Sequence, residues 1–276
     1  MEKSKVKILA GDLFVRFQEH DVLALGSQVA YNLLLALFPF LIFMMTVIGF
    51  SDVKSEDILV NLRQVLPVQA YDLIKHTIVE VVDTRRGHLL SFSLIATLWS
   101  ASSGFNAIIK GLNKSYREEE RRGFIKLQLL SLIFTVGFTF TIFAVFFFLI
   151  FGEINGKIIA SSLGLSQVFY YLWDWLRYLA MIVVMVLVFA VLYRYTPIKK
   201  HRWKEVLPGA LFTALAWVIA SVCFSLYVNN FSAYSKIYGS IGAVIILMLW
   251  LFITSVVIIF GGEINAVIME YKTQKR

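Results

Sequence analysis

Charged and amide side chains stand at the ends of long apolar runs in this chain, where they could do chemistry in a membrane. Glu263 and Asn265 follow two adjacent glycines at the end of the last apolar run. Asp174 and Arg177 lie three residues apart in an aromatic stretch. A charged side chain inside a bilayer is costly and often marks the route of an ion or a substrate. These residues therefore suggest binding or passage of a charged solute.

Both pairs also have a plainer interpretation. Water at a helix end could solvate Glu263, or the carboxylate could be buried and neutralised by Lys110 or Arg194, and the sequence leaves both possibilities open. For Asp174 and Arg177, anchoring among interfacial aromatic residues is favoured over a transport role. The reason is that few strongly apolar residues separate this pair from Arg194.

A polar face on the first apolar run adds further candidates. Gln28 and Asn32 are four residues apart, and so share one face of a helix, with Tyr31 beside them. Such polar faces most often join helices to one another. They would belong to a pathway if they faced one cavity with Asn106 and the turn between the last two runs. The candidate pathway residues are Gln28, Tyr31, Asn32, Asn106, Asp174, Arg177, Tyr227, Asn230, Tyr234, Tyr238, Glu263 and Asn265.

The motifs of several enzyme classes are absent from the sequence. His20, His76, His88 and His201 are scattered and form no H-x-H or H-E-x-x-H motif. A metal site needs several ligands that converge on one ion, so we expect no metal and no cofactor. The Gly-x-Ser-x-Gly motif of serine esterases and the Gly-x-x-x-x-Gly-Lys loop of ATPases are also missing. The sequence therefore predicts neither an enzyme nor an ATPase.

The composition is that of a membrane protein. Of the 276 residues, 59% are hydrophobic and only 16% are charged, whereas soluble proteins carry about 25% charged residues. The formal net charge of +8 lies at the edges of apolar runs, which indicates membrane topology rather than a nucleic-acid partner. The expected partners are membrane lipids. A single cysteine, Cys223, excludes a disulfide within the chain.

Apolar runs of membrane length position these candidates. From Ile241 to Phe260 the chain carries no charge; at about 1.5 Å per residue, a helix of this run covers about 30 Å, the thickness of the hydrocarbon core. The pattern predicts an all-α, polytopic membrane protein with 1–276 as a single domain. An amphipathic N-terminal helix comes first, and 51–88 is an extracytoplasmic helical hairpin. The six expected transmembrane helices are 23–50, 89–112, 124–151, 170–193, 206–228 and 239–268.

Prolines and small residues indicate how these helices bend and pack. Pro39 should kink the first span, and Pro208 with Gly209 should open the fifth as a first-turn proline. Small residues four apart, such as those around Gly104, allow close approach of helices. The kink and packing set is Pro39, Gly104, Pro208, Gly209, Gly239, Gly242 and Gly262. The connections are expected to be a charged loop at 116–122, an outer loop at 152–167, a basic loop at 199–204 and a short turn at 229–236.

Lysine and arginine are concentrated on one side of the predicted spans. They flank the N-terminus, the 116–122 loop, the 194–204 segment and the C-terminal tail. Such an excess marks the cytoplasmic face, so both termini are expected inside. The same basic loops could hold anionic lipid headgroups, although ordinary positive-inside topology already explains them.

Several segments are similar to a known family. The chain resembles the YihY/BrkB family of bacterial inner-membrane proteins, some of which were once labelled ribonuclease BN. The matching segments are QVAYNLLLALFPFLI (Gln28 to Ile42), LWSASSGFNAIIKGLNKSY (Leu98 to Tyr116), LPGALFTALAW (Leu207 to Trp217), FSLYVNNFSAYSKIYGSIGAVIILMLWL (Phe224 to Leu251) and GGEINAV (Gly261 to Val267). The resemblance covers nearly the whole chain in order. Asn32 is a departure, because the family more often has a small or aromatic residue there.

The resemblance implies six transmembrane helices and a bacterial plasma-membrane location, but no defined activity. Members of the family have been associated with serum resistance and with transport of lipid-like molecules. The leading hypothesis is a transporter or flippase-like protein for an amphipathic or anionic substrate, without its own ATPase. The alternative is a non-catalytic membrane organiser or regulator that acts through the outer 51–88 hairpin. A ribonuclease is disfavoured, because the sequence lacks clustered metal ligands.

Overall fold

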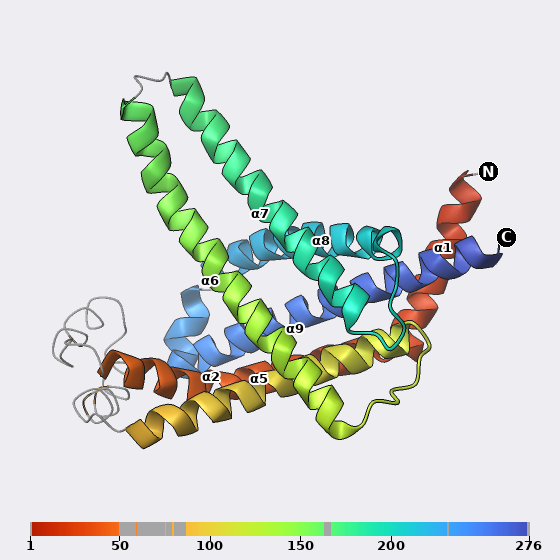
Figure 1. Cartoon of the computed structure of the whole chain (residues 1–276), viewed down its shortest axis with the longest axis horizontal. Helices are drawn as coiled ribbons and strands as arrows, with labels where there is room; N and C mark the ends of the chain where they lie inside the picture. Colours follow the sequence, from red (N-terminus) through yellow and green to blue (C-terminus); the bar gives the residue numbers. More distant parts are fainter. Residues whose placement is uncertain are drawn as a thin grey trace. The chain divides into compact units, whose positions relative to one another are not determined.

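A computed structural model describes residues 2–49, 59, 75, 79, 87–162, 167–230 and 232–274. All regular secondary structure in these ranges is α-helical, which confirms the predicted fold class (Figure 1). The helices are α1 (Glu2–Glu19), α2 (Val22–Gly49), α5 (Gly87–Ser115), α6 (Phe124–Ser162), α7 (Gln167–Tyr195), α8 (Trp203–Asn230) and α9 (Ser232–Gln274). The predicted 51–88 hairpin lies outside the described residues, apart from single positions and the start of α5.

Six of the described helices, α2 and α5 to α9, are long and apolar enough to cross a membrane. This confirms the predicted number of spans. Their apolar segments are Val22–Phe43, Ser91–Ser115, Phe124–Val145, Trp175–Tyr195, Trp203–Val228 and Gly242–Thr273. The remaining helix, α1, precedes the first span where the sequence predicts an N-terminal helix.

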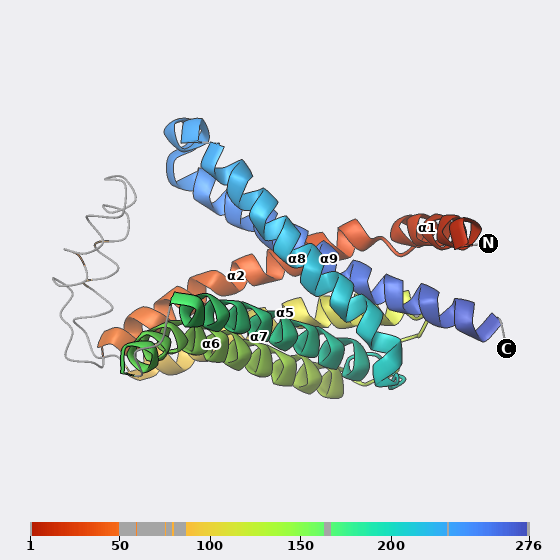
Figure 2. The ribbon, with the colours of Figure 1, turned by 90° about the horizontal axis from the view of Figure 1, so that it is seen from above.

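The chain forms two compact units. Unit 1 comprises Met1–Val22, Ile109–Val218 and Val257–Arg276, and unit 2 comprises Leu23–Ile108 and Ile219–Val256. Four helices contribute residues to both units: α5, α8 and α9, and α2 with its first residue, Val22. Within unit 1, α6 and α7 lie side by side and run antiparallel, as Figure 1 and Figure 2 both show. Unit 1 also contains every short segment in which the sequence concentrates lysine and arginine.

The turns after α1 and α5 each contain a non-glycine residue whose backbone is in the left-handed region. Asp21 (φ 52°) follows α1 and Arg117 (φ 55°) follows α5. After α5, the Glu118 N–H donates to the Asn113 carbonyl and the Arg117 N–H donates to the Lys114 carbonyl. These two bonds are the pattern of a Schellman cap, in which glycine is the usual left-handed residue. The cap ends α5 and fixes the position of its last turn.

The start of α8 differs from the prediction. Glu205 Oε2 accepts a hydrogen bond from the Arg202 N–H at 2.7 Å, which is one half of a capping box with Arg202 at the N-cap. This cap starts α8 at Trp203 inside the expected basic loop. Pro208 therefore lies in the helix interior, and the prediction of a first-turn proline was wrong.

Two predicted connections were also too long. The expected outer loop over 152–167 is largely helical, because α6 continues to Ser162 and α7 begins at Gln167. An isolated glycine costs a helix only about 1 kcal/mol, so Gly152 and Gly156 do not end α6. The expected turn over 229–236 is replaced by α8 up to Asn230 and α9 from Ser232.

Glycines permit close helix approach within unit 2. A Cβ at Gly104 of α5 would lie 3.3 Å from the Leu33 side chain of α2, and one at Gly26 of α2 would lie 2.6 Å from Val256 of α9. Gly104 and Gly242 are both buried. Pro39 lies within α2, and the surroundings of Gly239 lie outside the described side chains. The small-residue row through Gly104 therefore does lie at a helix contact.

Candidate functional site

The carboxylate of Glu263 lies at the centre of a buried polar cluster in unit 1. Glu263 is on α9 and is fully buried. Its Oε1 accepts a hydrogen bond from Ser115 Oγ at 2.8 Å and lies 2.6 Å from His20 Nδ1. Ser115 also lies 3.0 Å from the Gly111 carbonyl. The Ser115 hydroxyl has a single proton to donate. Since hydrogen bonds to charged acceptors are stronger, Ser115 donates it to the Glu263 carboxylate rather than to the Gly111 carbonyl when Glu263 is ionised.

A second layer of contacts holds the end of α1 against this cluster. Arg16 is buried, donates to the Ser115 carbonyl at 3.4 Å and forms an ion pair with Glu270. Phe17 packs edge-on against Phe260, with ring centroids 5.8 Å apart. Arg16 in the last turn of α1 and His20 just after its end are four residues apart, and their acidic partners both lie on α9. The last turn of α1 is therefore bound to α9 by two basic–acidic contacts.

An exposed ion pair at the turn after α1 contributes less. Lys114 Nζ lies 2.8 Å from Asp21 Oδ2, and both side chains are well exposed. The hydrogen bond and the charge of Lys114 hold the pKa of Asp21 below its ordinary value. Exposed pairs of this kind contribute little to stability. The docking of α1 thus depends mainly on the buried contacts of Arg16 and His20.

Next to Glu263 on α9, Asn265 and Gly261 form a tight junction with α8. Asn265 Oδ1 accepts a hydrogen bond from the Gly209 N–H at 2.6 Å. A Cβ at Gly209 would overlap the Gly261 carbonyl. These contacts bring together two residues that the sequence singled out for different reasons, Asn265 as a pathway candidate and Gly209 as a packing residue. They fix α9 against the first half of α8.

A tyrosine from α7 completes this junction. The Tyr193 hydroxyl donates to the Ile258 carbonyl at 2.7 Å and lies 2.7 Å from Thr213 Oγ1. Because Tyr193 has one hydroxyl proton, Thr213 must donate the second bond. A Cβ at Gly261 would overlap both hydroxyls, and one at Gly262 would overlap Leu112 of α5. The two glycines that precede Glu263 therefore allow three helices to approach α9.

An aromatic pair lies beside the cluster. The Tyr116 and His201 rings stack at 4.1 Å between centroids and 26° between planes. Burial raises the pKa of Tyr116, and the nearby charge of Glu263 acts in the same direction. Burial lowers the pKa of His201, against the opposing charges of Glu118 and Glu205. Tyr116 and His201 are therefore held neutral next to the buried carboxylate.

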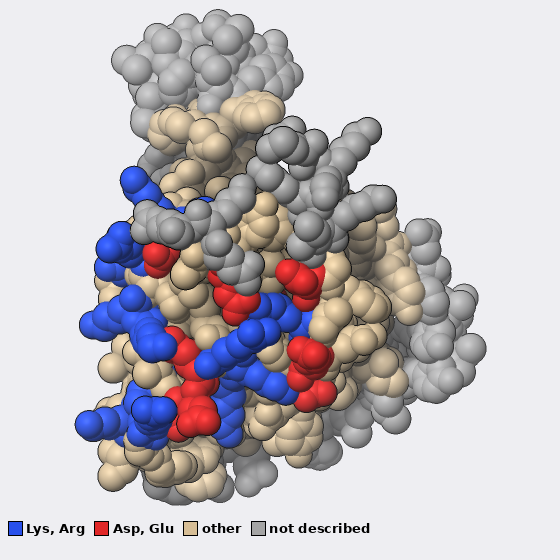
Figure 3. All heavy atoms as spheres, turned by 90° about the vertical axis from the view of Figure 1, so that its right-hand side faces the viewer, with Lys and Arg blue, Asp and Glu red and all other residues tan. Residues whose placement is uncertain are grey.

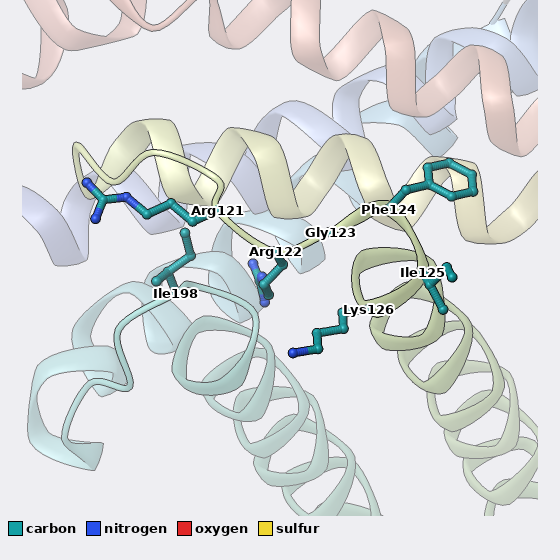
Figure 4. Close-up of a pocket in the computed structure, with 7 residues that line it drawn as sticks. All are labelled: Arg121, Arg122, Gly123, Phe124, Ile125, Lys126 and Ile198. Atoms are coloured by element: carbon teal, nitrogen blue, oxygen red, sulfur yellow. The ribbon is translucent and has the colours of Figure 1, made fainter.

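A pocket with basic and apolar walls opens at the start of α6. Its volume is about 630 Å³, and its walls are Arg121, Arg122, Gly123, Phe124, Ile125, Lys126 and Ile198. In Figure 4, Arg122 and Lys126 extend into the space between α6 and the segment that carries Ile198. Phe124 and Ile125 are 71% and 74% exposed and begin an apolar span. The pocket thus lies where the charged connection meets the apolar surface of α6.

Asn113 and Glu120 hold the walls of this pocket together. Asn113 is buried; its amide donates to Glu120 Oε2 at 2.7 Å, and its Oδ1 accepts from the Ile198 N–H at 3.1 Å. Arg122 forms two side-chain hydrogen bonds with Glu120 and donates to the Thr196 carbonyl at 2.9 Å. Burial raises the pKa of Glu120, but the bonds and charge of Arg122 outweigh burial and leave that pKa below its ordinary value. Glu120 is therefore an anion that neutralises Arg122.

The other two cations of the pocket, Arg121 and Lys126, have no close acidic partner among the described residues that neutralises them. Arg121 lies 3.8 Å from Glu119, and both side chains are more than 80% exposed. Lys126 forms no ion pair with any residue that the structure describes. Figure 3 shows acidic and basic side chains interleaved over the charged face of the molecule. Because Arg122 is paired with Glu120, Arg121 and Lys126 are the residues that leave net positive charge at the pocket.

The structure describes the side chains of some of the remaining pathway candidates. Gln28 and Tyr31 are exposed, and Asn32 donates to the Gln28 carbonyl of its own helix. Asn106 is half-buried in α5, and Tyr227 is partly exposed and stacks on Phe224. The side chains of Asp174, Asn230, Tyr234 and Tyr238 lie outside those described, so a shared cavity for the full set stays a prediction. Arg177 is buried, with its guanidinium 5.5 Å from the Tyr178 ring centroid.

Sequence reasoning named the wrong partners for Glu263. Lys110 is exposed, and the Arg194 guanidinium lies over the Trp203 ring at 4.6 Å. The actual partners, His20 and Ser115, were missed. No local spacing could have found them, because both come from segments far from Glu263 in the sequence.

Comparisons with known proteins place the chain in a family. The family model described as "Virulence factor BrkB" matches residues 13–276. The "Putative ribonuclease-like protein YfkH" of Bacillus subtilis (strain 168) is 40% identical over 261 residues, which cover 95% of each chain. A "UPF0761 membrane protein" of Alteromonas mediterranea is 24% identical over 282 residues, covering 99% of this chain and 91% of the relative. No solved structure matches the chain.

These matches agree with the six apolar helices of the structure and extend over nearly the whole sequence. The sequence resemblance to the YihY/BrkB family is thereby confirmed. The chain belongs to the virulence factor BrkB family of membrane proteins.

Proposed function

We propose that the protein is a transporter or flippase-like protein of the bacterial plasma membrane that moves an amphipathic anion without its own ATPase. The observation that carries this proposal is the pocket at the start of α6. It combines basic side chains with exposed apolar residues at the edge of a membrane span. A lipid-like anion needs both features, because its headgroup requires cations and its chains require an apolar surface.

The charge distribution of the pocket supports an anionic headgroup. Arg122 is neutralised by Glu120, whereas Arg121 and Lys126 have little or no compensation within the described residues. A cation near a membrane surface attracts anionic lipid by about 1 kcal/mol. Arg122 would act as a fixed donor and the other two as the attracting charges. A zwitterionic headgroup would gain less, since its own cation is repelled.

The apolar part of the pocket supports a molecule with acyl chains. Phe124 and Ile125 are largely exposed and stand at the beginning of the apolar segment Phe124–Val145. The row of exposed apolar residues continues along α6 through Ile125, Leu129, Ile133, Val136, Phe140 and Phe143. A substrate bound with its headgroup in the pocket could lay its chains along this row.

We further propose that the pocket and both termini face the cytoplasm. The support is the positive-inside rule, together with the grouping of all the basic short segments in unit 1.

The organiser hypothesis relies on the 51–88 hairpin, most of which lies outside the described residues. No group of three or more His, Cys, Asp or Glu side chains that could hold a metal occurs in the described part of the chain. The nuclease-like name of the Bacillus subtilis relative therefore gains no support from a residue cluster.

The test is lipid movement in vesicles that contain the purified full-length protein. Fluorescent phosphatidylglycerol or phosphatidylcholine would be placed in the vesicles, and exchange between leaflets followed by chemical quenching from outside. The proposal predicts faster movement of phosphatidylglycerol than in protein-free vesicles and a smaller effect on phosphatidylcholine. The double variant Arg121→Ala with Lys126→Ala should lose most of this difference. Lys272→Ala, which removes an exposed lysine elsewhere, should not. Equal rates with and without protein would contradict the proposal.

A further inference from the structure

We infer that His20, Ser115 and Glu263 form a buried proton-binding site, in which the ligand is a proton held between the carboxylate and the imidazole. Two structural observations carry this inference. Glu263 is fully buried in a membrane-spanning helix. Its Oε1 lies 2.6 Å from His20 Nδ1. The site is distinct from the pocket at α6 and does not depend on what that pocket binds.

The short distance itself requires a proton. A deprotonated imidazole nitrogen and a carboxylate oxygen both present lone pairs, which repel each other. At 2.6 Å the two atoms must therefore share at least one hydrogen. With one proton the pair has no net charge, both as imidazolium with carboxylate and as neutral imidazole with carboxylic acid. Removal of that proton would leave a buried carboxylate with only Ser115 as donor, which is strongly unfavourable.

The second carboxylate oxygen points to the same conclusion. Glu263 Oε2 is buried and has no hydrogen-bond partner among the described residues. A fully ionised, buried carboxylate normally recruits donors to both oxygens. Here one oxygen has two partners and the other has none. Such an arrangement suits a carboxyl group that shares or carries a proton better than it suits a permanent anion.

Among the described residues around the site, no charged side chain other than His20 serves as a counter-ion to Glu263. Arg16 is committed to Glu270 and to the Ser115 carbonyl. Burial keeps the Tyr116 hydroxyl neutral, and it also keeps His201, which stacks on the Tyr116 ring, neutral. Among the described residues, the titratable and charged groups that interact with the site or with its direct partners are Arg16 on α1, His20 and Asp21 in the turn after α1, Tyr116 after α5, His201 before α8, and Glu270 on α9. His20 is the cation source closest to Glu263.

Proton uptake or loss at this site should change the docking of α1. With one proton, His20 and Glu263 attract each other and reinforce the contact of Arg16 with Glu270. A second proton turns the pair into a net cation beside Arg16, and loss of the first leaves an unpaired anion. Both changes weaken the attachment of the last turn of α1. The attachment is therefore strongest while the pair holds a single proton.

The experiment uses the full-length protein in nanodiscs and follows the carboxyl region of its infrared difference spectrum as pH is varied. We expect a pH-dependent carboxylic-acid band that disappears in Glu263→Gln and remains in Glu270→Gln. The protection of the amides of residues 16–20, taken relative to the intrinsic exchange rate at each pH, should follow the same titration in wild-type protein and lose that dependence in Glu263→Gln. A band unchanged in Glu263→Gln, or protection at 16–20 that is the same at every pH in wild-type protein, would overturn the inference.

Discussion

His20 Nδ1 lies 2.6 Å from Glu263 Oε1, although 243 residues separate the two in the sequence. The contact joins the N-terminal helix to the last span inside unit 1. Because Glu263 is completely buried, the energy of this pair depends strongly on whether both partners are present. Removing one partner from a buried pair is much more costly than removing both.

This asymmetry predicts the outcome of a double-mutant cycle. His20→Ala should lower the free energy of unfolding by about 3 kcal/mol, because it leaves a buried carboxylate without its basic partner. Glu263→Gln in the same background should restore part of the loss, since a neutral amide is cheaper to bury. Unfolding of the purified variants in nanodiscs would measure this. A double variant no more stable than His20→Ala would contradict the pairing.

The glycines of the α8–α9 junction should not tolerate a methyl group. Gly261→Ala would place a Cβ against the Thr213 and Tyr193 hydroxyls, and Gly209→Ala would place one against the Gly261 carbonyl. Each should destabilise the protein by about 2 kcal/mol or more, because backbone and bonded hydroxyls must move. Gly137→Ala on α6 is the matched control, since nothing lies within 4 Å of its Cβ position. It should gain up to about 1 kcal/mol. Similar effects at all three glycines would be inconsistent with the close junction.

The cap that ends α5 can be improved. Arg117 has a φ of 55°, a conformation that glycine adopts at no steric cost. Its ion pair with Glu270 is exposed and long, at 3.7 Å, so little is lost on replacement. Arg117→Gly should therefore leave stability unchanged or raise it by up to about 1 kcal/mol. Arg121→Gly, without a positive φ, should not stabilise. Clear destabilisation by Arg117→Gly alone would show that the side chain matters more than the turn.

The buried histidine before α8 predicts a loss of stability in mild acid. Burial lowers the pKa of His201 from its ordinary value of 6.5, so the unfolded chain takes up a proton there before the folded chain does. Stability contributed by this group is therefore complete above pH 6.5 and falls as pH drops below that value. His201→Phe keeps an aromatic ring on Tyr116 and removes the titration. Thermal unfolding from pH 7.5 downward should be less pH-dependent in the variant than in wild-type protein. Identical profiles would argue against a buried neutral histidine.

The sequence predicts the helical class and the spans well, because these follow from the length of apolar runs. A run such as 241–260 leaves no other physical solution than a membrane helix. The predicted positions of the helix ends were less accurate. The basic letters around Arg202 suggested a loop, but the single hydrogen bond from Glu205 to its backbone starts α8 there.

The sites were only partly predictable, for a related reason. Glu263 and Asn265 stood out because a carboxylate and an amide are rare inside apolar runs. Their partners could not be read from local spacing, since Ser115 and His20 come from segments distant in the sequence. The pocket was hidden for another reason. The positive charge of the pocket remains because Glu120 neutralises Arg122 but neither Arg121 nor Lys126. Which of these cations Glu120 pairs with is decided by how the segments after α5 and after α7 fold.

The most direct test of the central claim reverses the charge of the pocket and measures lipid movement. Vesicles would contain wild-type protein, the double variant Arg121→Glu with Lys126→Glu, or Lys272→Glu as a control for a distant exposed lysine. The account predicts that wild-type and Lys272→Glu proteins move fluorescent phosphatidylglycerol between leaflets at similar rates, and that the double variant falls to the rate of protein-free vesicles. Movement by the double variant at the wild-type rate would contradict the account.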